Sequence, residues 1–157
     1  MLVAIIGENC SGKSTLADAI HAALGLEIAA GRDYLRMARS EAEARTRFRA
    51  RLARAVDGEG LVYVISEPEL LSLLPDGAVR VLVTADLDTI KRRFSARMRG
   101  SLPAPVAAML EKKHGLYDGV ACDYRYDGVN GDPAALCAAL RERAAGKTEG
   151  ETQSDII

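Results

Sequence analysis

One stretch near the start of the chain has the residue types and spacing of a phosphate-binding loop. Residues 7–14 read GENCSGKS, which fits the pattern G-x-x-x-x-G-K-[ST]. Gly7 and Gly12 permit backbone angles at which successive N–H groups converge on phosphate oxygens. Lys13 would bridge the β- and γ-phosphates of ATP, and the Ser14 hydroxyl would ligate Mg²⁺. We predict that ATP is bound by the whole loop, Gly7, Glu8, Asn9, Cys10, Ser11, Gly12, Lys13, Ser14 and Thr15.

The segments on either side of this loop are those that such a loop requires. A short β-branched run at residues 2–6 precedes it, and an amphipathic helical pattern at 14–24 follows. A helix that starts near Lys13 directs its positive N-terminal end at a bound phosphate. We interpret Cys10 as a small spacer in the loop and not as a nucleophile, because no base is evident beside it.

The rest of the chain alternates between apolar runs and helical patterns. Further strands are predicted at 26–30, 61–65, 79–83 and 124–129, and helices at 41–56, 69–74, 87–98, 106–114 and 133–145. This alternation predicts an α/β protein with a three-layer P-loop NTPase fold, in which a parallel sheet of about five strands carries helices on both faces. We expect one domain over residues 1–145, with a lid at about 98–106, and a flexible polar tail over 146–157.

Composition excludes several classes of protein. The 157 residues are 48% hydrophobic and carry 21 basic against 22 acidic side chains, so a nucleic-acid-binding role is not expected. No apolar run reaches the ~18 residues of a membrane helix, and no basic segment precedes residues 2–6 as in a signal peptide. Three cysteines without zinc-site spacing suit a reducing compartment. We therefore expect a cytoplasmic protein that needs neither membrane nor nucleic acid, and the oligomeric state stays open.

Three stretches beyond the loop resemble the nucleoside-monophosphate-kinase-like branch of P-loop kinases, which includes adenylate, cytidylate, shikimate and gluconate kinases. Residues 31–36 (GRDYLR) resemble the segment after the second strand of adenylate kinases, whose arginine holds the acceptor phosphate, which makes Arg36 its counterpart. Residues 84–99 resemble the helix that leads into the lid, where two arginines hold ATP phosphates, matching Arg93 and Arg97. Residues 126–131 (YDGVNG) resemble the end strand whose following loop touches the adenine.

Charge supports a catalytic role for the arginines independently of the resemblance. Phosphoryl transfer spreads negative charge that cations stabilise, and Arg93 and Arg97 share one helix face at i, i+4 spacing. Residues 32–57 also hold eight arginines against four acids, which indicates either an anionic ligand or a solvated helix face. For the arginines between 45 and 54 the solvated face is the favoured interpretation.

Two carboxylates near predicted strand ends are candidates for work beside Mg²⁺. Asp33 follows the second strand and Glu67 the third, so either could hold a metal-bound water or act as the base for a hydroxyl acceptor. Tyr34 is the best candidate to stack on an acceptor base. We interpret His21 and His114 as structural.

These features predict a kinase that moves the γ-phosphate of Mg·ATP to a small acceptor. A nucleoside monophosphate is the leading acceptor, and Asp33, Tyr34 and Arg36 would contact it. Lys13, Glu67, Arg93 and Arg97 are the predicted catalytic residues, and Ser14, Asp33 and Glu67 the predicted metal contacts. The alternatives are a kinase for a small hydroxyl-bearing metabolite and a nucleotide-binding regulatory protein without transfer.

Overall fold

A computed structural model describes the backbone of residues 1–154 and the side chains of residues 1–146. The strands are β1 (Leu2–Ile6), β2 (Glu27–Ala30), β3 (Leu61–Ile65), β4 (Val79–Thr84) and β5 (Tyr124–Asp127). The α-helices are α1 (Lys13–Leu24), α2 (Glu41–Asp57), α3 (Leu87–Arg97), α4 (Ala104–Lys113) and α5 (Pro133–Ser154). Two short 3-10 helices, η1 (Asp33–Met37) and η2 (Pro68–Leu73), follow β2 and β3.

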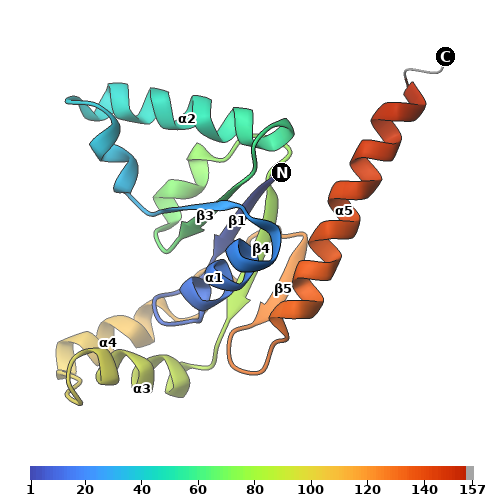
Figure 1. Cartoon of the computed structure of the whole chain (residues 1–157). Helices are drawn as coiled ribbons and strands as arrows, with labels where there is room; N and C mark the ends of the chain where they lie inside the picture. The colour runs from blue at the N-terminus through green and yellow to red at the C-terminus, as the bar shows by residue number, and fades with distance from the viewer. Residues whose placement is uncertain (155–157) are drawn as a thin grey trace.

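The five strands form one parallel sheet in the order β2-β3-β1-β4-β5, which places β1 at its centre (Figure 1). β1 pairs with β3 on one side and β4 on the other, and every residue of β1 and β3 is buried. Such strands read as continuous apolar runs because helices cover both faces of a parallel sheet. The predicted α/β fold and its parallel sheet are confirmed.

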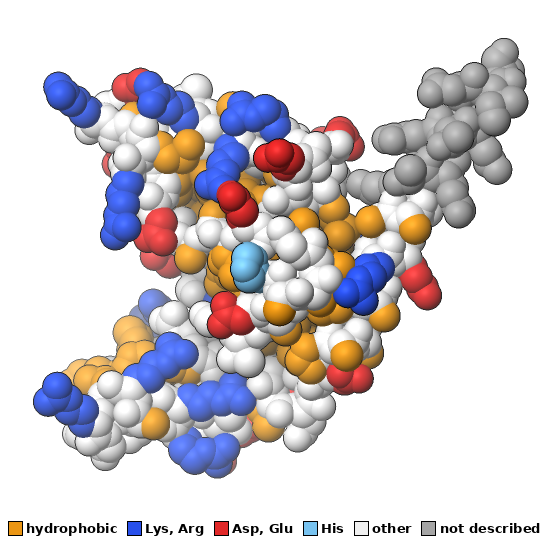
Figure 2. All heavy atoms as spheres, in the orientation of Figure 1, with side chains coloured by type: hydrophobic (Ala, Val, Ile, Leu, Met, Phe, Trp, Pro, Cys, Tyr) orange, Lys and Arg blue, Asp and Glu red, His pale blue; other side chains and the backbone are white. Residues whose placement is uncertain are grey.

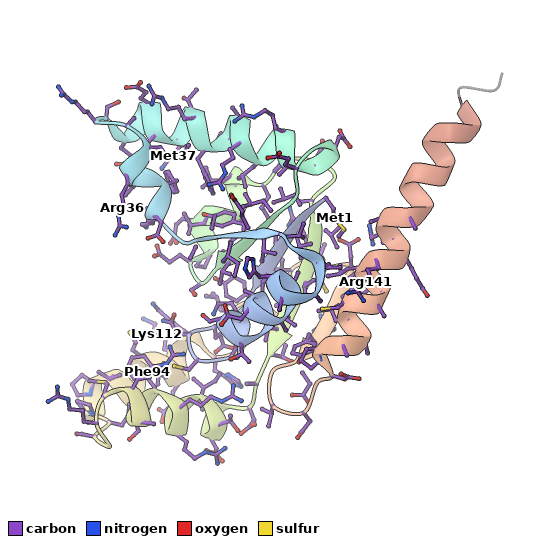
Figure 3. The ribbon with its side chains drawn as sticks, viewed as in Figure 1. Met1, Arg36, Met37, Phe94, Lys112 and Arg141 are labelled. Atoms are coloured by element: carbon purple, nitrogen blue, oxygen red, sulfur yellow. The ribbon has the colours of Figure 1, made fainter. Side chains whose placement is uncertain are left out.

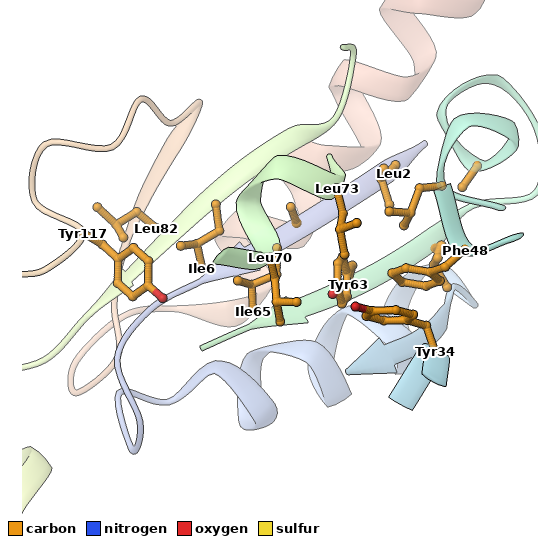
Figure 4. Close-up of a cluster of buried hydrophobic side chains, with 14 of the residues drawn as sticks. Leu2, Ile6, Tyr34, Phe48, Tyr63, Ile65, Leu70, Leu73, Leu82 and Tyr117 are labelled. Carbon is orange, nitrogen blue, oxygen red and sulfur yellow. The ribbon is translucent and has the colours of Figure 1, made fainter. Parts of the chain in front are cut away.

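Alternate residues of the central strands enter two separate cores. Leu2, Ala4 and Ile6 of β1 face α2 and the two 3-10 helices, where Phe48 packs between Tyr34 and Tyr63 (Figure 4). Val3 and Ile5 face α1 and α5 on the opposite side. The carboxyl ends of β2, β3 and β1 are therefore held side by side at one edge of the sheet.

Helices α3 and α4 form a pair beside the end of the sheet that carries the phosphate loop (Figure 1). Ile90 of α3 and Leu110 of α4 pack against Cys10 in a third, smaller core. Cys10 is therefore a buried packing residue, and its contacts join the helix pair to the loop.

The predicted helix end at residue 145 is wrong, because α5 continues to Ser154. Gly146 lies inside this helix, where a glycine costs only about 1 kcal/mol, and the next residues along the helix include the good helix formers Lys, Glu and Gln. Residues 155–157 of the predicted tail lie outside the described residues. Among the helices that are described, none has the length and apolar character needed to cross a membrane.

Candidate active site

The phosphate loop occupies the carboxyl end of β1, the central strand, and leads directly into α1. The Gly7 N–H donates to the Ile65 carbonyl at 3.2 Å, which joins the start of the loop to β3. Gly12 ends the loop with φ 111°, a conformation that a side chain would strain, and α1 begins at the next residue. Cys10 also has a positive φ of 63°. The loop therefore has the sharp turn that aims backbone N–H groups and the helix N-terminus at one point.

Lys13 is the buried cation of this loop. Its side chain is only 5% exposed, and its Nζ donates to the Glu8 carbonyl at 2.6 Å across the turn. Burial is the main cause that lowers the pKa of Lys13 to about 8; Cys10 and Glu8 oppose this shift and the neighbouring Arg97 adds to it. A bound polyphosphate would reverse this shift, because negative charge favours the protonated amine.

A cavity of about 400 Å³ opens beside Lys13. It brings together residues from four separate segments of the chain: Asn9, Cys10, Gly12, Lys13, Ser14 and Thr15 of the loop and α1, Ala30, Gly31, Arg32 and Asp33 after β2, Val64, Ser66, Glu67 and Leu70 around the end of β3, and Arg97 of α3. The structure thus brings the predicted residues Lys13, Ser14, Asp33, Glu67 and Arg97 to one place.

Arg93 and Arg97, which the sequence pairs, lie in different surroundings. Arg93 donates to the Cys10 carbonyl at 3.2 Å and to the Gly128 carbonyl at 2.9 Å. It therefore joins the phosphate loop to the loop after β5 and lines no part of the cavity beside Lys13. Arg97 lines that cavity, its charge acts on Lys13, and no hydrogen bond or ion pair of its side chain occurs among the described residues.

A neighbouring cavity of about 380 Å³ lies on the other side of the loop. Its lining includes Thr15, Arg93, Arg97, Tyr126 and the turn from Gly128 to Pro133. Asp127 shapes this turn, because its carboxylate accepts the N–H groups of Val129 and Asn130, and these bonds lower the pKa of Asp127. The segment predicted to touch the adenine therefore borders a space continuous with the loop.

Several solved structures share the fold of this chain over nearly its whole length. A gluconokinase from Sinorhizobium meliloti 1021 is 17% identical with a TM-score of 0.59, and the match covers 92% of this chain and 95% of that one. The shikimate kinase of Acinetobacter baumannii in complex with shikimate is 16% identical with a TM-score of 0.59, covering 93% of each chain. A deoxyadenosine kinase from M. mycoides is 14% identical with a TM-score of 0.53, covering 93% of this chain and 100% of that one. The chain has the P-loop kinase fold. No protein-family model and no curated protein matches the sequence.

Within this kinase fold, the structure adds an ion pair that the sequence pattern did not predict. Arg32 donates through Nε and Nη2 to Glu67 Oε2, both at 2.8 Å, across the mouth of the cavity. A signal for it was present, since each residue stands two positions after the end of its strand, and β2 and β3 are adjacent parallel strands. Glu67 is therefore held at the cavity by a cation and not left free.

The structure does not support two of the predicted acceptor contacts. Tyr34 is 4% exposed and stacks on Phe48 at 5.0 Å, so no ring face is open to an acceptor base. The interpretation of Tyr34 as a stacking residue is wrong because η1 turns the ring into the core. Arg36 is exposed and projects outward from η1, and it lines neither cavity (Figure 3).

The arginine-rich helix α2 behaves as a solvated face. Arg45 and Arg47 each pair with a glutamate four residues earlier, at 3.3 and 2.6 Å, and Arg51 pairs with Glu27 at 2.9 Å. Figure 2 shows basic side chains over α2 and over the α3–α4 pair, with the surface hollowed between them. The candidate site lies at the carboxyl edge of the sheet and not on α2.

The oxygen donors of the cavity fit Mg²⁺ bound together with ATP. Ser14, Asp33 and Glu67 all line the cavity and present hydroxyl or carboxylate oxygens, the ligands that Mg²⁺ prefers. No group of three or more His, Cys, Asp or Glu side chains among the described residues could hold a metal by itself. This suits Mg²⁺ in a kinase, where one or two carboxylates and the substrate phosphates share the ion with water.

Proposed function

We propose that this protein transfers the γ-phosphate of Mg·ATP to a small acceptor. The observation that carries the proposal is the desolvated Lys13 amine, which faces a cavity shared by Arg97 and two carboxylates. The lysine and the loop N–H groups would hold the β- and γ-phosphates, and Arg97 would neutralise the charge that develops on the migrating group. The likeness of the fold to the solved kinases is consistent with this chemistry.

The lining of the cavity favours a hydroxyl acceptor over a phosphate acceptor. A phosphate acceptor needs a cation of its own, but Arg36 lies outside the cavity, Arg32 is already paired with Glu67, and Arg97 is assigned to the migrating phosphoryl group. Asp33 lines the cavity, and its side chain has no hydrogen bond or ion pair among the described residues. These two features support Asp33 as the general base of the proposed reaction.

In the proposed reaction the acceptor hydroxyl oxygen attacks the γ-phosphorus. A new P–O bond forms, the bond from the γ-phosphorus to the bridging oxygen breaks, and ADP leaves. The hydroxyl proton passes to the Asp33 carboxylate. Mg²⁺, held by the Ser14 hydroxyl and by Glu67 either directly or through water, would supply charge neutralisation to the phosphates.

A coupled ADP-release assay across small hydroxylated metabolites and nucleoside monophosphates tests the proposal. We expect acceptor-stimulated ADP release, and a phosphorylated product that mass spectrometry identifies. A protein that binds ATP but releases no ADP with any acceptor would instead be a regulatory nucleotide-binding protein.

Two variants separate the acceptor classes. For a hydroxyl acceptor, Asp33→Asn should lower kcat by about 10²-fold or more, the usual contribution of general base catalysis, and added Mg²⁺ should not restore it. Arg36→Lys should leave both KM values nearly unchanged. If Arg36→Lys raises only the acceptor KM and Asp33→Asn is mild, the acceptor carries a phosphate and the assignment of a hydroxyl is refuted.

A further inference from the structure

A third cavity, of about 520 Å³, adjoins the one beside Lys13. Asn9, Ser66 and Glu67 line both, so the two spaces meet at the phosphate loop. The remaining lining comes from Glu8 of the loop, from Pro68 and Glu69 of η2, and from Met109, Leu110, Lys113, Leu116 and Tyr117 in and after α4. A molecule in this cavity lies next to the point where the γ-phosphate would be held.

The buried hydroxyl of Tyr117 lacks a partner in this cavity. The residue is 3% exposed, and no hydrogen-bonding group in the described part of the chain reaches its oxygen. Figure 4 shows the Tyr117 oxygen directed toward the end of β1, where the phosphate loop begins. A buried hydroxyl without a hydrogen bond costs free energy, and Tyr117, unlike the core residue Tyr34, lines an open cavity, so its position indicates a polar group of a ligand.

The carboxylates around Tyr117 differ in how they are engaged. Glu8 binds the His114 ring at 3.1 Å and the Gly115 N–H at 3.3 Å, and Glu67 binds Arg32. The carboxylate of Glu69 has no hydrogen bond or ion pair among the described residues, and its backbone carbonyl accepts from the Ser72 hydroxyl at 3.0 Å. Glu69 is therefore the carboxylate available to a ligand.

The electrostatic environment of the Tyr117 hydroxyl is negative. Burial, together with the nearby carboxylates of Glu69, Glu67 and Glu8, raises the pKa of Tyr117 to about 12. Lys113 is the one basic side chain in the cavity lining as described, and it is exposed at the end of α4. Three glutamates against one lysine in the lining favour a cationic ligand over one with a carboxylate or phosphate substituent.

We propose that this cavity binds the phosphoryl acceptor, and that the acceptor carries an ammonium group in addition to the hydroxyl that receives the phosphate. The inference rests on the proposed function and specifies its substrate class. The ammonium group pairs with Glu69 and donates to the Tyr117 hydroxyl, while the carbon atoms of the acceptor lie against Met109, Leu110 and Leu116. The acceptor hydroxyl then extends past Asn9 and Ser66 toward the cavity beside Lys13.

The test compares probes of similar size that carry an ammonium group, no charge or a carboxylate. D-glucosamine is compared with D-glucose and D-gluconate, and 2-aminoethanol with 1,2-ethanediol and glycolate. Binding is followed at low ionic strength by NMR, through the methyl signals of Met109 and Leu116 and the ring signals of Tyr117, with the full chain and ATP present. We expect the ammonium probes to bind at least about tenfold more tightly than their neutral partners, as one charge-assisted hydrogen bond provides, and added salt to reduce the difference.

Glu69→Gln should remove this preference, whereas Glu59→Gln, an exposed carboxylate outside this cavity, should keep it. Equal or tighter binding of the anionic probes, or no shift at Met109, Leu116 and Tyr117 with any ammonium probe, overturns the inference. The same samples are assayed for ADP release. If the protein turns over neutral or anionic acceptors, and Glu69→Gln leaves that turnover unchanged, the ammonium acceptor is refuted but the proposed transferase activity stands. If no acceptor supports turnover, the transferase activity itself is refuted.

Discussion

Replacing Arg93 and Arg97 one at a time with alanine separates two roles that the sequence assigns to the pair jointly. Arg93 makes two hydrogen bonds to backbone carbonyls, at 3.2 and 2.9 Å, which hold the phosphate loop against the loop after β5. Hydrogen bonds from a charged donor contribute about 1.5–3 kcal/mol each, and their partly buried setting places the pair near the lower end, at about 3 kcal/mol in total. For a chain of this length, that loss corresponds to a fall in Tm of roughly 6–12 °C.

Arg97 has no such partners among the described residues, so its loss should leave Tm within about 2 °C of the parent. Its charge lies beside Lys13 in the cavity, and cations that stabilise a migrating phosphoryl group supply about 10³-fold or more in kcat. We therefore expect Arg97→Ala to lower kcat by at least about 10²-fold, and Arg93→Ala to act mainly by lowering Tm and raising the ATP KM.

Differential scanning fluorimetry and steady-state kinetics on both variants provide the assay. Lys91→Ala is a matched control, because Lys91 is on the same helix and pairs only with Glu111 at the surface. If Arg97→Ala lowers Tm as much as Arg93→Ala does while kcat is retained, the distinction drawn from the hydrogen bonds is refuted. A loss of kcat in Arg93→Ala at unchanged Tm and ATP KM would also refute it.

The geometry of the loop and the core leads to three further expected outcomes. Because the pKa of Lys13 is lowered to about 8, the amine loses its charge as pH rises from 7 to 9, and calorimetry should show that ATP affinity falls over this interval. Lys13→Ala should bind ATP weakly at every pH, and an ATP affinity of the parent that does not change with pH would contradict the assignment. Gly128→Ala should weaken ATP binding at least about tenfold, since the new Cβ would overlap the Ser11 carbonyl, whereas Gly119→Ala, with open space around it, should bind ATP as the parent does. Tyr34→Phe should retain full activity and gain up to about 1 kcal/mol of unfolding free energy, because it removes a buried hydroxyl without a partner. Equilibrium urea unfolding and steady-state kinetics measure both effects, and a raised acceptor KM in Tyr34→Phe would show that Tyr34 contacts the acceptor.

The parallel fold could be predicted from local patterns. Each of the apolar runs at 2–6 and 61–65 is a fully buried central strand in the structure, because burial on both faces leaves a continuous apolar signature in the sequence. The phosphate loop was equally recognisable, since its function depends on backbone turns and on residues adjacent in the chain. The end of α5 could not be recognised from the sequence, because Gly146 is a weak helix breaker whose effect depends on the helix propensity of the residues after it.

The residues that complete the site depend on contacts between distant segments. Sequence alone determined that a Gly-rich loop, a lysine and a following helix form one phosphate-binding unit within eight consecutive positions. Only the tertiary structure decided that Arg32 engages Glu67, that Tyr34 faces the core, and that Arg93 is bound to backbone carbonyls while Arg97 is not. The physical reason is that a side chain's partner across strands is fixed by sheet order, register and rotamer, and none of these is encoded in the spacing of neighbouring residues.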